Sequence, residues 1–308
     1  MSRISFIGIG RIGQTIAYAV LTSGFADEVV LYDRDAEKTD KFKQELLHAL
    51  ATLEVKTKII TTSSLGAVDN SDVVVISAGI PRKPGDDRRD LFKRNASLMK
   101  EFAESLPKTN PNAKYVMVSN PVDMMASVFM KFSGKFIISS GTQVETMRMR
   151  SFIAEKLGIP VTKVDGFVAG EHGDAAAFLW DTVTIDGIEF DKMANDKLSR
   201  TEVEKYVKEV AAQIIAVIGS TTWGQAKVIK DIVKAIITNE NRVMSVAVPV
   251  KYDDETIHIG IPTVIGNEIG PSIEHSLSEE DVAKLENAKK EVYAAYKQLL
   301  DDFLASTK

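Results

Sequence analysis

The sequence predicts an α/β protein in two parts: a doubly wound parallel sheet over residues 1–141 and an α+β domain over residues 142–308. In the first part, short apolar runs alternate with amphipathic stretches, which is typical of a parallel sheet with helices on both faces. Beyond about Gly141 this alternation stops, and longer helices and paired strands are indicated instead. A chain of 308 residues is also long enough for two domains.

The predicted strands of the first part are short and apolar, and they cover residues 4–9, 28–33, 58–61, 72–77, 114–119 and 135–139. Amphipathic helices are predicted between several of them, over residues 12–23, 36–50, 90–106 and 124–131. Strands that alternate with helices in this way pair in parallel, because each helix carries the chain back across the sheet.

In the second part, a helix over about residues 144–157 is predicted to end at Gly158, and the pair Asp186-Gly187 predicts a tight hairpin. The remaining elements are two helices, two antiparallel strands and a final helix with an acidic first turn, over residues 200–218, 222–238, 242–251, 255–265 and 278–304. No linker rich in Pro, Gly or Ser separates the two parts. We therefore expect them to pack tightly, with a cleft between them.

Composition excludes several classes of protein. Lys and Arg total 38 against 43 Asp and Glu, so the net charge is −5. The sequence therefore shows no excess of positive charge that would bind nucleic acid or an anionic membrane. No apolar run approaches the ~20 residues that span a bilayer. The N-terminus enters a strand pattern without a leader, so we expect a cytoplasmic protein. Cysteine is absent and the four histidines show no metal-ligand spacing, so neither thiol chemistry nor a metal site is expected.

A glycine-rich string follows the first predicted strand and opens the first predicted helix. It runs Gly8-Ile9-Gly10-Arg11-Ile12-Gly13. Such glycines allow a tight turn, and the helix N-terminus offers unpaired N–H groups to a pyrophosphate. Asp33 ends the next strand about 20 residues later, where a carboxylate hydrogen-bonds a ribose 2′-hydroxyl. The pattern predicts a Rossmann dinucleotide-binding domain; the alternative is a plain glycine turn with Asp33 as a solvated strand end.

Asp33 also predicts which dinucleotide is bound. A carboxylate accepts a hydrogen bond from a 2′-hydroxyl and repels a 2′-phosphate, so the expected cofactor is NAD. The neighbouring Arg34 leaves a weaker use of NADP open.

Four further strings carry groups suited to chemistry on an anionic substrate. They are Gly170-Glu171-His172-Gly173-Asp174, the cationic loop over residues 80–90, Ser119-Asn120-Pro121-Val122-Asp123, and a helix start with Glu145 and Arg148 on one face. Among the side chains, histidine has the pKa closest to neutral pH and so suits proton transfer. An arginine can bind a carboxylate through two parallel hydrogen bonds. Each string also has a structural alternative: a capped turn histidine, a solvated loop, a helix cap by Asn120, and a surface ion pair.

Taken together and in this order, these strings resemble the lactate/malate dehydrogenase family along almost the whole chain. The segment Gly219-Ser220-Thr221-Thr222-Trp223-Gly224 adds to the resemblance, and it is most similar to the lactate-dehydrogenase-like branch of malate dehydrogenases. The resemblance implies NAD-dependent oxidation and reduction of a 2-hydroxy acid, a place in the tricarboxylic acid cycle, and a homodimer or homotetramer.

The resemblance also implies a role for individual residues. His172 is expected to donate and accept the proton, and Glu145 to hydrogen-bond its ring, although the family usually carries aspartate at that position. Arg88 is expected to polarise the substrate carbonyl from a mobile loop. Substrate contacts are expected from Arg82, Arg88, Asn120, Arg148 and Thr221, and cofactor contacts from Gly8, Gly10, Arg11, Ile12, Gly13, Asp33, Asn95 and Asn120.

Arg82 bears on the choice of substrate. Lactate enzymes of the family usually carry glutamine at this loop position and malate enzymes arginine, so Arg82 favours a small dicarboxylate, malate or oxaloacetate. With pyruvate the arginine would be buried without an anion, which costs about 3–5 kcal/mol. The alternatives are an L-lactate dehydrogenase and a non-catalytic NAD-binding protein. An NAD-dependent glycoside hydrolase would need a metal held by cysteine, which the chain lacks.

Overall fold

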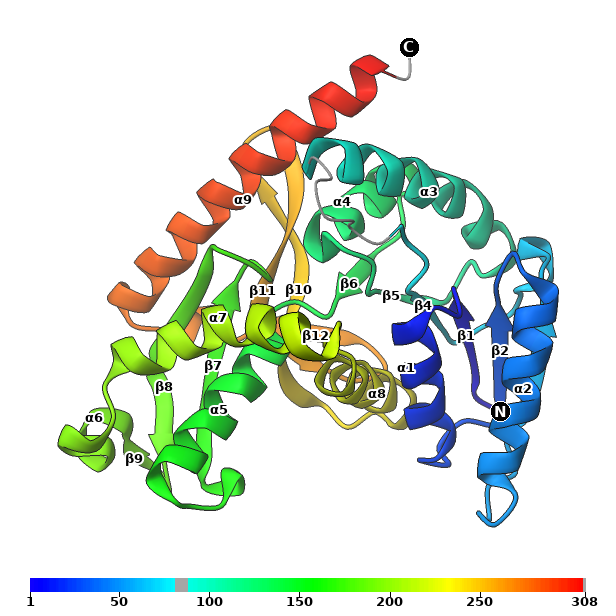
Figure 1. Ribbon diagram of the computed structural model, residues 1–308. Coiled ribbons are helices and arrows are strands. Elements are labelled where there is room, and N and C mark those ends of the chain that lie inside the picture. The colour runs from blue at the N-terminus through cyan, green and yellow to red at the C-terminus, as the bar shows by residue number, and fades with distance from the viewer. Residues whose placement is uncertain (81–87, 307–308) are drawn as a thin grey trace.

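The first half of the chain builds a parallel sheet, as predicted. The computed structural model describes residues 1–80 and 88–306 (Figure 1). The strands of this half are β1 (Arg3–Ile7), β2 (Glu28–Tyr32), β3 (Lys58–Thr62), β4 (Val73–Ile76), β5 (Lys114–Met117) and β6 (Ile137–Ser139). The helices are α1 (Arg11–Leu21), α2 (Ala36–Leu50), α3 (Arg88–Thr109) and α4 (Val122–Ser133), with a 3-10 turn, η1, at Leu65–Ala67.

These strands run in the order β3-β2-β1-β4-β5-β6, and all neighbours pair in parallel. The order reverses between β1 and β4, and ligands of such sheets bind at the carboxyl ends of the strands beside that point. Side chains alternate across the sheet. Phe6 packs with the core that contains α1, whereas Ile7 packs with the core that contains α3 and α4. Both faces are therefore covered by apolar helices, as a parallel sheet requires.

The second half adds six strands to the described part of the chain, together with a set of helices. Its strands are β7 (Val164–Gly170), β8 (Ala176–Ile185), β9 (Ile188–Glu189), β10 (Arg242–Tyr252), β11 (Glu255–Ile265) and β12 (Ile269–Ser272). Its helices are α5 (Gln143–Leu157), α6 (Phe190–Ala194), α7 (Arg200–Ile218), α8 (Trp223–Thr238) and α9 (Glu279–Ser306), with 3-10 turns η2 (Val161–Lys163), η3 (Asn195–Lys197) and η4 (Glu274–Ser276).

The two halves share one sheet. Strand β10 pairs with β6 through Ala247 and Ser139, and the order continues β10-β11-β7-β8-β9, with β12 on β11. Across residues 1–80 and 88–306 this gives a twelve-stranded sheet. Helix α8 packs against α1, and α9 spans from β8 to α3 (Figure 1). The expected tight packing of the halves is confirmed.

Most predicted elements are present, but three strands were missed and one prediction is wrong. The missed strands are β7, the part of β8 before the hairpin, and β12. The hairpin around Asp186-Gly187 was expected to extend to Phe190, but Phe190 begins helix α6. The pattern of β7 is broken by a bulge between Asp165 and Phe167. Gly166 lies there at φ +128°, and a Cβ on it would come within 2.7 Å of Val183. Glycines of this kind weaken the alternation by which a strand is predicted.

No helix in the described part of the chain is both long and apolar enough to span a bilayer.

Candidate active site

The glycine-rich string forms the turn between β1 and α1. At two of its positions, close contacts leave no room for a side chain. Gly8 has φ +98°, and a Cβ there would lie 2.6 Å from Ala78. A Cβ on Gly13 would lie 2.1 Å from the carbonyl oxygen of Gly8. By contrast, no atom lies within 4 Å of the Cβ position of Gly10, where α1 is capped. The open side of Gly10, next to the unpaired N–H groups at the start of α1, suits a pyrophosphate.

Asp33 lies at the end of β2, beside this turn. Its Oδ2 accepts hydrogen bonds from the Ile9 N–H at 2.9 Å and from the Lys38 ammonium at 2.8 Å. Burial opposes ionisation, but these donors hold the pKa of Asp33 below its ordinary value, so the carboxylate is charged. Lys38 was missed by sequence analysis, because no motif assigns a role to a lysine on the helix after this strand. Arg34 pairs with Glu101 at 2.7 Å.

A pocket of about 230 Å³ lies against Asp33. It is bounded by the turn at Gly8 and Gly10, by the loop after β4, and by Leu98 and Phe102 of α3. An apolar wall opposite a carboxylate suits a nucleoside, whose base is apolar on its faces and whose ribose offers hydroxyl donors. These residues therefore fit NAD, with Asp33 toward the ribose and Gly10 toward the phosphates.

The loops after β4 and β5 are held together by a buried amide. Asn95 is 1% exposed; its Oδ1 accepts from the Ile80 N–H at 2.8 Å and its Nδ2 donates to the Asn120 carbonyl at 2.8 Å. Asn95 thus positions both loops through their main chains. Asn120 is exposed, and the cap of α4 is Pro121. The alternative in which Asn120 caps this helix is therefore wrong, and its amide remains available to a ligand.

His172, Glu145 and Arg148 meet in one cluster. The Nδ1 atom of His172 lies 3.0 Å from each carboxylate oxygen of Glu145. Arg148, one turn along α5, donates from Nη1 to Oε1 of Glu145 at 2.9 Å. The histidine side chain is 23% exposed and that of Glu145 only 8%. The predicted hydrogen bond is present, and the longer arm of Glu145 reaches the ring without a break in α5.

The charges of this cluster are coupled. The Glu145 carboxylate, acting against the effect of burial, raises the pKa of His172 to about 9. Burial alone would raise the pKa of Glu145, but the charges of His172 and Arg148 hold it below its usual value. The resting protein therefore favours an imidazolium beside a carboxylate. Because Nδ1 is engaged by Glu145, Nε2 is the ring nitrogen left to exchange a proton.

The segment with Thr221 joins α7 to α8 and lies between the two halves (Figure 1). Ser220 accepts a hydrogen bond from Arg11 of the glycine-rich turn at 2.9 Å. A Cβ on Gly224 would come within 3.7 Å of Val144, which precedes Glu145. The segment is thus tied to the cofactor turn on one side and to the start of α5 on the other, and Thr221 is half-buried between them.

Arg82 lies outside the described residues, as does the side chain of Arg88, whose backbone begins α3. Their expected substrate contacts stay predictions from the sequence. Among the residues that are described, no group of three His, Asp or Glu side chains is arranged to hold a metal ion.

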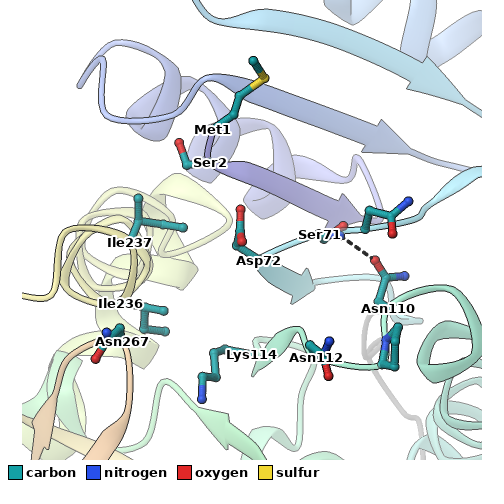
Figure 2. A pocket seen from close by; sticks show the side chains of 12 residues that line it. Met1, Ser2, Ser71, Asp72, Asn110, Asn112, Lys114, Ile236, Ile237 and Asn267 are labelled. Carbon is teal, nitrogen blue, oxygen red and sulfur yellow. Dashed lines mark hydrogen bonds between the residues drawn. The ribbon is translucent and has the colours of Figure 1, made fainter.

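A larger hollow of about 530 Å³ lies at the opposite edge of the sheet (Figure 2). It is lined by Met1, Ser2, Asp72 and Lys114, at the amino ends of β1, β4 and β5. Its wall includes the hydrogen bond from the Ser71 N–H to Asn110, drawn in Figure 2. Parallel sheets bind ligands at the carboxyl ends of their strands, and none of the candidate side chains that the structure describes lines this hollow. A larger volume than that of the nucleotide pocket therefore does not make it the candidate site.

The fold and the site together define a class of enzyme. The chain combines a nucleotide cradle at the carboxyl edge of a parallel sheet with a histidine poised for proton exchange, and reactions that couple hydride transfer to proton transfer require both. Comparison with known proteins identifies the family within that class. Residues 2–136 match the lactate/malate dehydrogenase NAD binding domain, and residues 142–302 match the lactate/malate dehydrogenase alpha/beta C-terminal domain.

Individual relatives agree with this assignment. Malate dehydrogenase of Sulfolobus acidocaldarius is 53% identical over 302 residues, with 98% of each chain covered. Malate dehydrogenase of Sulfurisphaera tokodaii is 51% identical, with 97% of each chain covered. A solved structure of a lactate dehydrogenase from a Medee basin deep-sea metagenome superposes with a TM-score of 0.89 at 29% identity, over 98% of each chain. The chain belongs to the lactate/malate dehydrogenase family, and its cofactor is NAD.

Proposed function

We propose that this chain is an NAD-dependent malate dehydrogenase, which interconverts (S)-malate and oxaloacetate. The observation that carries the proposal is the contact of His172 with Glu145, whose carboxylate also binds Arg148, in a chain that carries a cradle for NAD. The proteins that are 53% and 51% identical over nearly the full length are named malate dehydrogenase, whereas relatives named L-lactate dehydrogenase are about 31% identical.

The proton chemistry follows from the state of His172. Bound NADH supplies the hydride that reaches the keto carbon of oxaloacetate. His172 gives a proton from Nε2 to the carbonyl oxygen, so that the hydroxyl of malate forms and the ring becomes neutral. In the oxidation of malate the neutral ring takes the proton back. Glu145 holds one tautomer of the neutral ring and stabilises the imidazolium, as the carboxylate beside the histidine of serine proteases does.

The substrate is held by cations and amides. Arg148 binds the carboxylate next to the reacting carbon, Arg82 the second carboxylate, and Arg88 polarises the carbonyl as charge develops. Asn120 hydrogen-bonds near the same oxygen. Thr221 lines the pocket between the two halves. Arg82 makes the site specific for dicarboxylates, because pyruvate would leave its charge unpaired.

The two halves of the chain have different roles in binding. Residues 1–141 bind NAD and also contribute Arg82, Arg88 and Asn120 to the substrate site. Residues 142–308 contribute Arg148, Thr221 and the proton-transferring pair His172 and Glu145. We place the enzyme in the cytoplasm and in the tricarboxylic acid cycle, and we expect a homo-oligomer.

A steady-state assay tests the proposal. The loss of NADH absorbance is followed with oxaloacetate and with pyruvate, and each substrate is also tested with NADPH. A kcat/KM for oxaloacetate at least 10²-fold above that for pyruvate supports malate dehydrogenase activity, since the unpaired arginine alone accounts for about that ratio. A preference for pyruvate contradicts it.

A further inference from the structure

A second buried carboxylate lies beside His172. Asp123 is in the first turn of α4 and is 3% exposed. Its Oδ2 accepts the main-chain N–H of His172 at 3.0 Å, and its Oδ1 accepts the hydroxyl of Ser139 at 2.6 Å. The residues it joins are far apart in the sequence, in α4, at the end of β6 and in the loop between β7 and β8. Asp123 therefore connects the catalytic loop to the parallel sheet.

Within the described part of the chain, few hydrogen bonds hold the main chain of the loop that carries His172. Gly170 and Gly173 flank the histidine, and Gly170 has φ +86°. The other main-chain hydrogen bonds near the histidine, from Glu171 to the Ala175 carbonyl and from Gly173 to the Glu171 carbonyl, lie within the loop. These bonds shape the loop, but they do not attach it to another element. Glu145 orients the ring, and Asp123 anchors the backbone from which the ring extends.

Asp123 also stands three residues after Asn120. The main chain of Asn120 is held from the other side by Asn95. A rigid start of α4 thus carries both the amide expected to meet the substrate oxygen and the carboxylate that anchors His172. A shift of about 1 Å between two such groups can cost ~10²-fold in rate.

We propose that Asp123 is a positioning residue for proton transfer: its carboxylate fixes the main chain of His172 relative to Asn120, so that both groups meet the same substrate oxygen. The proposal rests on the proposed dehydrogenase function, and the residue itself does not touch substrate.

The charge of Asp123 has a second effect. Among the residues that the structure describes, the charged groups near His172 are Glu145 and Arg148 of α5, Asp123 of α4 and, within the loop itself, Glu171. Asp123 adds to the negative potential that favours the imidazolium. Burial raises the pKa of Asp123 itself to about 6, while the donors from His172 and Ser139 oppose that rise, so the carboxylate is mostly charged above neutrality. Loss of its charge lowers the pKa of His172.

Two substitutions separate positioning from charge. Asp123→Ala removes both hydrogen bonds, and kcat for oxaloacetate reduction falls about 10–100-fold while the KM for NADH stays within about twofold. Asp123→Asn keeps an oxygen for the His172 N–H and offers an amide to the Ser139 hydroxyl, so kcat recovers to within about fivefold of the wild type. Because the charge is gone, the alkaline limb of its pH–rate profile moves to lower pH.

Asp281→Ala is the matched control. Asp281 is also fully buried in the first turn of a helix, α9, and it also accepts a distant main-chain N–H, that of Asp181 at 3.1 Å. Its loss lowers the melting temperature without changing kcat. The same measurement on the Asp123 variants confirms that they are folded during the assay.

Clear results overturn the proposal. The proposal is wrong if the Asp123→Ala variant is folded and its kcat lies within twofold of that of the wild type. It is also wrong if the Asp123→Asn variant is folded but no more active than the Asp123→Ala variant. If the alanine variant does not fold, the asparagine variant decides: a kcat more than about fivefold below the wild type refutes the positioning role, and an unmoved alkaline limb refutes the effect of the Asp123 charge on His172. A wild type that prefers pyruvate contradicts the proposed substrate instead, and the same comparison is then made with pyruvate.

Discussion

Glu145→Gln tests the coupling between Glu145 and His172. The substitution keeps the size of the side chain and removes its charge. Glu145 is the main reason why the pKa of His172 rises from its usual 6.5 to about 9, a difference that corresponds to about 3 kcal/mol in favour of the imidazolium. Without the carboxylate, burial and Arg148 oppose protonation and Asp123 still favours it, so the pKa falls toward its usual 6.5.

The expected loss of activity depends on pH. At pH 8 a group of pKa 9 is about 90% protonated and one of pKa 6.5 about 3%, so protonation alone lowers the rate of ketone reduction about 30-fold. At pH 6 both forms are mostly protonated, and the loss that remains measures the orientation and stabilisation of the ring. By analogy with the protease carboxylate, we expect a total loss in kcat of about 10²–10⁴-fold at pH 8.

The assay is NADH oxidation by saturating oxaloacetate at pH 6 and pH 8, with Glu155→Gln as the control. Glu155 lies on the same helix but is exposed, so its neutralisation leaves kcat unchanged. Glu145→Asp restores most activity if α5 can move to bring the shorter carboxylate to the ring. A Gln variant with kcat within threefold of the wild type at both pH values would show that the partner of His172 lies elsewhere.

The same pair also affects stability. Because the pKa of His172 is higher in the folded protein than its usual 6.5, this stabilisation is complete below pH 6.5 and is lost as pH rises through about 9. The lowered pKa of Glu145 means that its contribution is lost at acid pH, below the usual 4.5. The loss of melting temperature in Glu145→Gln is therefore greatest between about pH 4.5 and 6.5 and disappears above pH 9.

Cofactor choice, substrate choice and acid stability depend on three other side chains. Asp33→Ser removes the carboxylate that repels a 2′-phosphate and frees Lys38 to attract it, so the ratio of kcat/KM for NADH over NADPH falls at least tenfold; an unchanged ratio contradicts the role of Asp33. Arg82→Gln lowers kcat/KM for oxaloacetate and raises it for pyruvate, and an unchanged ratio in the two-substrate assay refutes dicarboxylate recognition by this residue. Burial lowers the pKa of His258 to about 4, so the free energy of unfolding falls as pH decreases from 6.5 toward 4; urea titrations of His258→Gln should show a shallower fall, and an equal slope rules this histidine out.

The local pattern of residues was enough to predict much of the fold. Gly13 is required by a contact with Gly8, five residues before it, and Asp33 follows from its place at the end of the next strand. Helix α7 begins and ends at the predicted residues, because Ser199 caps it and Gly219 ends it in the left-handed conformation. Features of this kind depend on spacing along the chain, which a sequence displays directly.

The contacts of the site depend on residues far apart in the chain. The hydrogen bond of Asp123 to the main chain of His172 and the Arg11–Ser220 hydrogen bond have no signature in spacing. Asp123 stood inside a string that sequence analysis had selected, yet its partner is 49 residues away. The direction of a buried carboxylate is set by the donors that surround it after folding. The sequence therefore identifies the class of chemistry and its main residues, and the packing of the two halves determines which of them meet and how strongly they are charged.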